Sequence, residues 1–139
     1  TQKNNGLCPV CGRKVTVGVM HRVRLLADRE NGFRPQQAFG FESLIPLAEI
    51  IAEVHGMGVT SKRVTGEYEK LLVRFGSELS ILRTCPTADL RAAGWELLAE
   101  AIDRMRSGRV DINPGYDGEY GTVGIVSAAE RRVKQPALF

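Results

Sequence analysis

Two cysteines near the start of the sequence have the types and spacing of metal ligands. Cys8 and Cys11 form a CxxC pair, with Pro9 between them and Gly12 directly after. Such a turn is typical of zinc knuckles, where it presents two thiolates to one ion. A thioredoxin-like redox pair would follow a strand and open a helix, whereas this pair follows a polar leader. The pattern therefore predicts Zn²⁺ as a structural cofactor bound by Cys8 and Cys11.

The two cysteines account for half of a zinc site, because a structural site is tetrahedral and needs four ligands. The remaining candidates in the chain are few, since it has three cysteines and two histidines in all. His21 lies ten residues beyond Cys11, and Cys85 precedes Pro86 far along the chain, so neither has knuckle spacing. We expect the missing ligands upstream of Thr1, in a longer protein of which this sequence is a piece.

A loop rich in glycine and tyrosine is the second candidate site. The stretch PGYDGEYG (114–121) contains Gly115, Tyr116, Asp117, Gly118, Tyr120 and Gly121. Glycines let the backbone approach a ligand closely, and tyrosine rings can stack on a base. Pro-Gly and Asp-Gly are also ordinary turn dipeptides, so the same residues predict a hairpin loop between two short strands. The pattern alone favours the ordinary hairpin.

A basic cluster is the third candidate. The segment MHRVRLLADR (20–29) contains His21, Arg22, Arg24 and Arg29. It is suited to contact DNA phosphates, although a charged, solvated helix face is the commoner use of such a segment. His55 follows an apolar helical stripe and precedes Gly56, which indicates a histidine at a helix C-terminus.

The composition is that of an ordinary globular protein, with 43% hydrophobic and 25% charged residues and a net charge of +3. Arginine outnumbers lysine by 14 to 5, which suits phosphate binding but also follows from a G+C-rich genome. No apolar run approaches the length of a membrane helix, and the odd cysteine count indicates a reducing, cytoplasmic location. Paired-carboxylate, HExxH and Walker motifs are absent from the sequence, so no complete catalytic site is expected.

Apolar periodicity predicts an α+β fold, a mostly helical domain with a few short strands and an N-terminal partial zinc knuckle. Helices are expected within 16–32, 46–58, 60–76 and 86–108, a strand within 77–84, and a strand, loop and strand within 109–126. The expected division is 1–32 for the knuckle and following helix, 33–126 for the helical domain, and 127–139 for a flexible polar tail. We find no internal repeat in the sequence.

Several motifs, taken in order, resemble one protein family. They are CPVCGRK (8–14), VMHRVRLLADR (19–29), FESLIPLAEIIAEVHG (41–56), EYEKLLVRFGSELSIL (67–82) and PGYDGEYG (114–121). Together they resemble the C-terminal portion of endonuclease Q, a DNA-repair enzyme of archaea and some bacteria, over most of residues 6–124. The family consists of an N-terminal polymerase-and-histidinol-phosphatase (PHP)-type nuclease domain, a zinc-binding segment and a helical C-terminal portion.

The resemblance implies a role in cutting DNA on the 5′ side of deaminated bases (uracil, hypoxanthine and xanthine) and abasic sites. The catalytic metal ligands of the family belong to the N-terminal domain, so we expect no catalytic residue and no strand cleavage from this chain alone. The resemblance also implies that the zinc segment begins upstream of Thr1. The expected partners are DNA with deaminated bases and the nuclease domain of the parent chain, with no membrane involved.

Lesion recognition gives the loop and the basic cluster a functional interpretation. An enzyme that acts on a lesion in duplex DNA extrudes the nucleotide, which then needs a stacking surface and backbone hydrogen bonds. In this hypothesis either tyrosine of the 114–121 loop stacks on the base, and the arginines of 20–29 follow the phosphates. The alternative is a zinc-containing protein-interaction module without lesion recognition. A stand-alone zinc enzyme ranks last, because a catalytic set is missing.

The last residues, KQPALF, resemble the pentapeptide that binds the bacterial sliding clamp. Gln135 would fix the orientation, while Leu138 and Phe139 would enter an apolar clamp pocket. Pro136 departs from the usual leucine at its position. A five-residue pattern also arises by chance, so an incidental Leu-Phe at the end of the sequence is the alternative.

Overall fold

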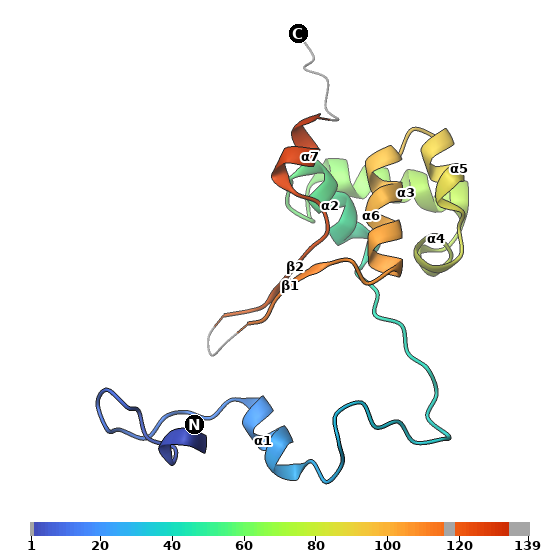
Figure 1. Ribbon diagram of the computed structural model, residues 1–139. Helices are drawn as coiled ribbons and strands as arrows, with labels where there is room; N and C mark the ends of the chain where they lie inside the picture. Colours follow the sequence, from blue (N-terminus) through green and yellow to red (C-terminus); the bar gives the residue numbers. More distant parts are fainter. Residues whose placement is uncertain (1, 116–118, 134–139) are drawn as a thin grey trace. The chain divides into compact units, whose positions relative to one another are not determined.

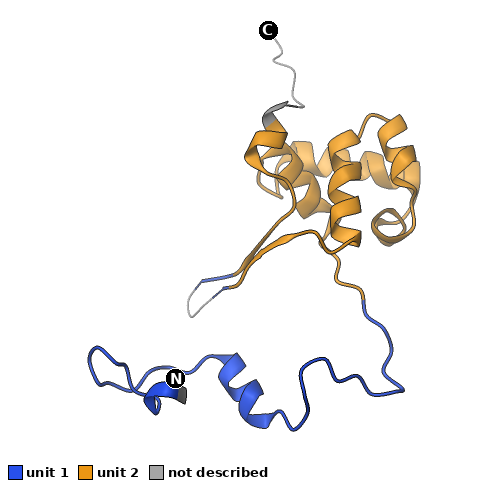
Figure 2. Cartoon of the chain, in the orientation of Figure 1, with its two compact units in different colours: residues 1–41, 115–120 blue, residues 42–114, 121–139 orange. Residues whose placement is uncertain are grey.

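The computed structural model describes residues 2–115 and 119–133. The chain divides into two compact units. The first comprises Thr1–Phe41 with Gly115–Tyr120, and the second comprises Glu42–Pro114 with Gly121–Phe139 (Figure 2).

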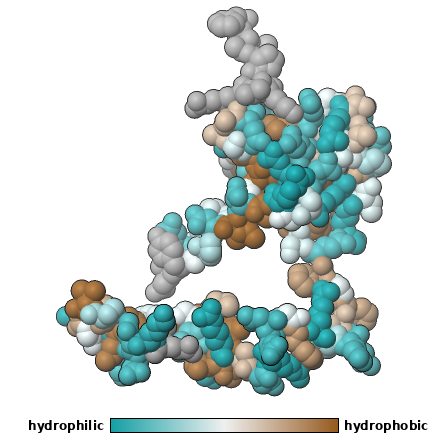
Figure 3. Space-filling view, in the orientation of Figure 1, coloured by the Kyte–Doolittle hydropathy of each residue, from teal (hydrophilic) through white to brown (hydrophobic). Residues whose placement is uncertain are grey.

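Residues 1–41 contain little regular structure. A 3₁₀ turn, η1 (Gln2–Asn4), precedes a turn closed by a single antiparallel bridge between Leu7 and Lys14. Helix α1 (Val19–Leu26) follows, which confirms the helix expected within 16–32 but limits it to eight residues. None of the side chains described between residues 3 and 41 is buried. Exposed apolar side chains are therefore spread along this part of the chain (Figure 3).

The second unit is a bundle of helices with a two-stranded antiparallel sheet (Figure 1). Its helices are α2 (Leu47–His55), α3 (Lys62–Phe75), α4 (Glu78–Arg83), α5 (Thr87–Ala92), α6 (Glu96–Arg106) and α7 (Ala128–Val133), and its strands are β1 (Asp111–Asn113) and β2 (Thr122–Gly124). The largest fully buried side chains are Leu47, Ile50, Ile51, Val64, Leu71, Ile81, Leu82, Leu90, Leu98 and Ile102. The mostly helical α+β fold class is thus confirmed.

Local signals set the ends of the first two helices of the bundle. Helix α2 starts directly after Pro46 and ends at Gly56, whose left-handed backbone (φ 62°) suits glycine. Helix α3 is capped by Ser61, whose hydroxyl accepts a hydrogen bond from the Val64 N–H at 3.4 Å, and Gly76 follows its last residue. These boundaries agree with the helices expected within 46–58 and 60–76.

The strand expected within 77–84 is wrong, because this segment forms helix α4. The Ser77 hydroxyl accepts a hydrogen bond from the Ser80 N–H at 3.2 Å, so the segment begins with a helix cap. Ile81 and Leu82 are adjacent and both buried, whereas a half-buried strand would bury alternate residues.

The single helix expected within 86–108 is also wrong, because it is divided into α5 and α6. Gly94 has a left-handed backbone (φ 94°), which ends α5 and lets α6 start two residues later. Pro86 occupies the cap position of α5, and Thr87 is its first helical residue.

The break at Gly94 creates a structural repeat that the sequence analysis did not find. In α2–α3 the Met57 N–H bonds to the Ala52 carbonyl at 2.9 Å, directly after the left-handed Gly56. In α5–α6 the Trp95 N–H bonds to the Leu90 carbonyl at 2.9 Å, directly after Gly94. Both helical pairs are therefore αα-hairpins whose first helix ends in the same way, although residues 56–61 link α2 to α3 and only residues 93–95 link α5 to α6. Helix α4 lies between the two pairs in the chain.

Candidate nucleic-acid interface

Backbone hydrogen bonds hold the turn around the CxxC pair. The Cys8 N–H bonds to the Arg13 carbonyl at 2.8 Å, and the Gly12 N–H bonds to the Cys8 carbonyl at 2.9 Å. Gly6 and Gly12 both have left-handed backbones (φ 76° and 67°), which let the chain reverse twice within a few residues. The Val15 N–H closes the turn on the Gly6 carbonyl at 2.9 Å.

The same turn favours the thiolate form of Cys8. Hydrogen bonds to the Cys8 sulfur lower the pKa of its thiol. The largest effect comes from the Cys11 backbone N–H, followed by the Val10 backbone N–H and the Cys11 side chain. The thiolate is the form that binds zinc, so the pair fits half of a tetrahedral zinc site. Zinc bound there would need two further ligands.

The structure does not supply those two ligands. Across the described part of the chain, no group of three or more histidine, cysteine and acidic side chains is placed to hold a metal ion. Cys85 is buried in the core of the second unit, and burial raises the pKa of its thiol. His21 is half-buried on α1, and its imidazole does not join the cysteine pair in such a group.

The basic cluster is brought together only in part. His21, Arg22 and Arg24 belong to α1, and both arginines are exposed. Arg29 lies beyond the end of the helix, where it pairs with Asp28 at 3.6 Å and its guanidinium lies 4.7 Å from the centre of the Phe33 ring. Residues 1–41 hold seven basic and two acidic side chains, so this part of the chain has a positive field.

The expected strand, loop and strand is a β-hairpin, whose strands pair Asp111 with Gly124, Ile112 with Val123 and Asn113 with Thr122. Tyr116, Asp117 and Gly118 lie outside the described residues. Of the described loop residues, Gly115, Tyr120 and Gly121 are all exposed, and the Tyr120 side chain is 96% exposed. Its ring is thus available for stacking.

The α2–α3 turn is a candidate phosphate site that the sequence analysis missed. The first backbone N–H groups of α3 have no acceptor within the helix, as at any helix start, and Lys62 and Arg63 lie beside them with exposed side chains. The signal was present in VHGMGVTSKR, where two glycines flank Met57 and two basic residues follow a helix cap. It was interpreted only as the end of one helix and the start of the next.

The tail holds the remaining predicted residues. Residues 128–133 of the expected flexible tail form helix α7 instead. Gln135, Leu138 and Phe139, the predicted clamp-binding residues, lie outside the described residues. Among the described helices, none has the length and apolar character required to cross a bilayer.

Comparison with known proteins connects the helical unit to a family. Residues 46–109, which contain both αα-hairpins, match the family described as the MJ0043 C-terminal domain. An uncharacterized protein of Methanocaldococcus jannaschii is 34% identical over 125 residues, which are 88% of this chain but 15% of that protein.

Two solved structures show a similar fold. The lesion-specific endonuclease PfuEndoQ from Pyrococcus furiosus is 31% identical, with a TM-score of 0.74 over 98% of this chain and 35% of its own. Endonuclease Q in complex with a 27-mer duplex that has an abasic lesion at the active site is 34% identical, with a TM-score of 0.71 over 91% of this chain and 31% of its own. The chain is therefore related in sequence and fold to part of endonuclease Q, and spans about a third of that protein.

Proposed function

We propose that this chain is the DNA- and lesion-recognition portion of a repair endonuclease that cuts 5′ of deaminated bases and abasic sites. One observation carries the proposal: nearly the whole chain matches endonuclease Q, and one matching structure is a complex with lesion-containing duplex DNA. Uracil, hypoxanthine and xanthine are the deaminated bases that this function would cover.

The helical unit supplies the first type of DNA contact in this proposal. Helix N-termini and backbone N–H groups bind phosphate oxygens, and nearby basic side chains add an electrostatic attraction. The α2–α3 turn has both, since Lys62 and Arg63 begin α3. Arg22, Arg24 and Arg29 add positive charge in residues 1–41. These contacts bind any sequence and weaken as salt rises.

The loop of residues 114–121 supplies the second type of contact, to the extruded base. Tyr120 presents an almost fully exposed ring, and the neighbouring glycines leave the backbone accessible. Base–aromatic stacking contributes about 1–3 kcal/mol per base. Gly115, Tyr116, Asp117, Gly118 and Gly121 complete the proposed loop contact.

Catalysis, zinc and further partners complete the proposal. We infer that strand cleavage requires a PHP-type nuclease domain of the parent chain, which also carries the catalytic metal ligands. Cys8 and Cys11 bind Zn²⁺ together with two ligands from outside residues 1–139. Gln135, Leu138 and Phe139 dock a bacterial sliding clamp. The parent protein acts in the cytoplasm on DNA.

A protein-interaction module remains the second candidate. The observation that favours it is the exposure of apolar side chains on α1, where Val19 is 80% and Leu26 65% exposed. A protein surface would cover such residues, whereas duplex DNA would contact the charged ones.

Fluorescence anisotropy separates the two functions. The 139-residue chain is titrated with labelled duplexes that contain an abasic site, a uracil or no lesion. We expect tighter binding to both lesions, and a loss of at least about fivefold in lesion affinity for Tyr120→Ala. Phe39→Ala is the matched control, because Phe39 is also an exposed aromatic residue (97%) but lies outside the loop.

A second pair of substitutions tests the phosphate contact. Lys62→Gln/Arg63→Gln should weaken binding to all three duplexes alike and reduce the salt slope by about two. Equal affinity for the three duplexes, unchanged by Tyr120→Ala, would reject lesion recognition and favour the interaction module.

A further inference from the structure

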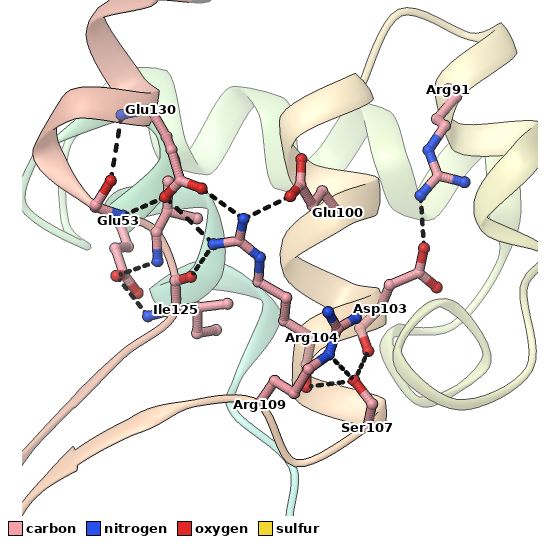
Figure 4. Close-up of polar contacts among 11 residues, drawn as sticks. Glu53, Arg91, Glu100, Asp103, Arg104, Ser107, Arg109, Ile125 and Glu130 are labelled. Atoms are coloured by element: carbon pink, nitrogen blue, oxygen red, sulfur yellow. Dashed lines mark hydrogen bonds and ion pairs between the residues drawn. The ribbon is translucent and has the colours of Figure 1, made fainter.

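The segment that follows strand β2 is held by side chains rather than by a strand partner. We name residues 125–127 the hairpin root. Ile125 and Val126 are each 5% exposed, and both of their N–H groups donate to one carboxylate oxygen, Glu53 Oε1, at 2.7 and 2.9 Å (Figure 4). Glu53 belongs to α2, so a helix of the first αα-hairpin anchors the root.

Helix α6 anchors the same segment from the acceptor side. Arg104 Nη1 donates to the Ile125 carbonyl at 2.9 Å and to Glu130 Oε2 at 3.2 Å. Its Nη2 donates to Glu100 and again to Glu130 (Figure 4). Hydrogen bonds to ionised groups are stronger than neutral ones, so this guanidinium is a firm anchor.

Helix α7 completes the arrangement. The Ser127 N–H donates to Glu130 Oε2 at 2.8 Å, and the Glu130 N–H donates to the Ser127 hydroxyl at 3.3 Å. This reciprocal pair is a capping box, which starts α7 directly after the root. Side chains of α2, α6 and α7 thus satisfy three N–H groups and one carbonyl of the root.

The hairpin has a short ladder and few buried side chains, so its own contacts do little to fix its direction. Its ladder has three residue pairs, and a two-stranded hairpin is at best marginally stable alone. Ile112 and Val123 in the strands are 69% and 46% exposed, whereas Val110, just before β1, packs against the core. The direction of the strands is therefore set where they leave the helical unit.

From this geometry we propose that Glu53, Arg104 and Glu130 are positioning residues that fix the β1–β2 hairpin on the helical unit for lesion recognition. The inference rests on the proposed function, because it assigns these residues a role in lesion recognition. None of the three needs to touch DNA. Releasing the root lets the strands swing, and a small misplacement of a binding group costs much of its effect.

Glu53→Ala in the full chain tests the proposal, because it leaves two buried N–H groups without their acceptor. Amide hydrogen exchange of residues 122–126 should become faster by about tenfold or more, and preference for abasic over plain duplex should fall by a similar factor. The salt slope should stay unchanged, because no phosphate contact is removed. Glu53→Gln keeps an acceptor oxygen, so it should restore most of the slow exchange and most of the lesion preference.

Asp103→Asn is the matched control, since it removes the Arg91–Asp103 ion pair (2.6 Å) on α6, the helix of Arg104, without touching the root. It should leave exchange and lesion preference as in the parent. If Glu53→Ala fails to fold, Glu130→Gln tests the same root from α7 and should shift both measurements in the same direction.

Two results would overturn the inference: root exchange unchanged in both variants, or faster exchange with the lesion preference intact. A parent chain with no lesion preference would reject the proposed function instead. In that case the exchange measurement still tests the positioning of the hairpin. Faster root exchange in Glu53→Ala than in Asp103→Asn would support it, and equal exchange in the two variants would reject it.

Discussion

Residues 1–41 and the helices α2–α6 are held in place by different means. The helices bury a continuous set of apolar side chains, and charged side chains bond to helix ends, Glu78 at the start of α2 and Arg106 near the end of α4. Residues 1–41 have no buried side chain among those described, and the α1 stripe of Val19, Val23 and Leu26 is exposed. Because apolar burial is the main stabilising contribution in folding, helices α2–α6 can hold their fold without residues 1–41. Residues 1–41 lack such burial among the side chains described, so we expect their order to depend on a bound metal, DNA or protein surface.

The sharpest test of this difference is a pair of core substitutions. Leu98 on α6 is 1% exposed, so Leu98→Ala should lower the free energy of unfolding by about 2–5 kcal/mol. Val23 on α1 is 48% exposed, and Val23→Ala should change it by less than about 0.5 kcal/mol. Urea denaturation of both variants measures this. A large effect of Val23→Ala would show that α1 belongs to the cooperative unit.

Zinc should order the knuckle without stabilising the helices. NMR spectra of a longer parent chain that carries the two further ligands, recorded with and without Zn²⁺, should show new dispersed amide signals from residues 6–15, because a knuckle's fold depends on its metal. Cys8→Ser should abolish them, while Cys85→Ser serves as the control that leaves them in place. Zinc-dependent shifts spread through α2–α6 would contradict the separation of the two regions.

Arg106 should make a smaller contribution within the helical unit. Its guanidinium donates to the carbonyls of Ile81, Leu82 and Cys85 at 2.8–2.9 Å, which satisfies the end of α4. Arg106→Ala should lower the free energy of unfolding by about 1–2 kcal/mol, since solvent screens part of the bonds. Arg109 is the control, because its side chain donates to the Ser107 hydroxyl at 2.9 Å and to no backbone carbonyl among the described residues, and Arg109→Ala should be near neutral. Similar losses for both would reject the capping role.

The pH dependence of stability should show the smallest effect. The Arg104 guanidinium, followed by the backbone and hydroxyl of Ser127, lowers the pKa of Glu130 from 4.5 to about 2. A lowered folded-state pKa means that the contribution is complete above pH 4.5 and is lost as the pH falls towards 2. The stability difference between the parent and Glu130→Gln should therefore shrink across this window. A constant difference would mean that the Glu130 charge does not stabilise the fold.

Features set by residues close together in the sequence were predicted, and features set by distant contacts were missed. The helices within 46–58 and 60–76 were predicted, because capping by residues such as Ser61, Gly56 and Gly76 depends on neighbours a few positions apart. The break at Gly94 was missed, since a glycine within an apolar stripe is compatible with a continuous helix as well as with a left-handed turn. The packing of α6 on α2, which the sequence does not show, favours the left-handed turn over a continuous helix.

The candidate site shows the same limit. A turn at the CxxC pair was predictable, because a few neighbouring residues form it; its metal stays a prediction. The bonds from Glu53 to Ile125 and Val126 join residues 72 and 73 positions apart, and no local pattern indicates them. The repeat of the αα-hairpins was also hidden, because the two turns share backbone geometry but little sequence, GMG in one and AGW in the other.

Amide hydrogen exchange of the chain with and without an abasic-site duplex tests the central claim most directly. The proposed function predicts protection of residues 56–63, at the α2–α3 turn, and of residues 114–121, in the hairpin loop. A plain duplex should protect the first segment but not the second. Protection of neither segment, with changes confined to residues 16–41, would contradict DNA recognition by the helical unit and its hairpin.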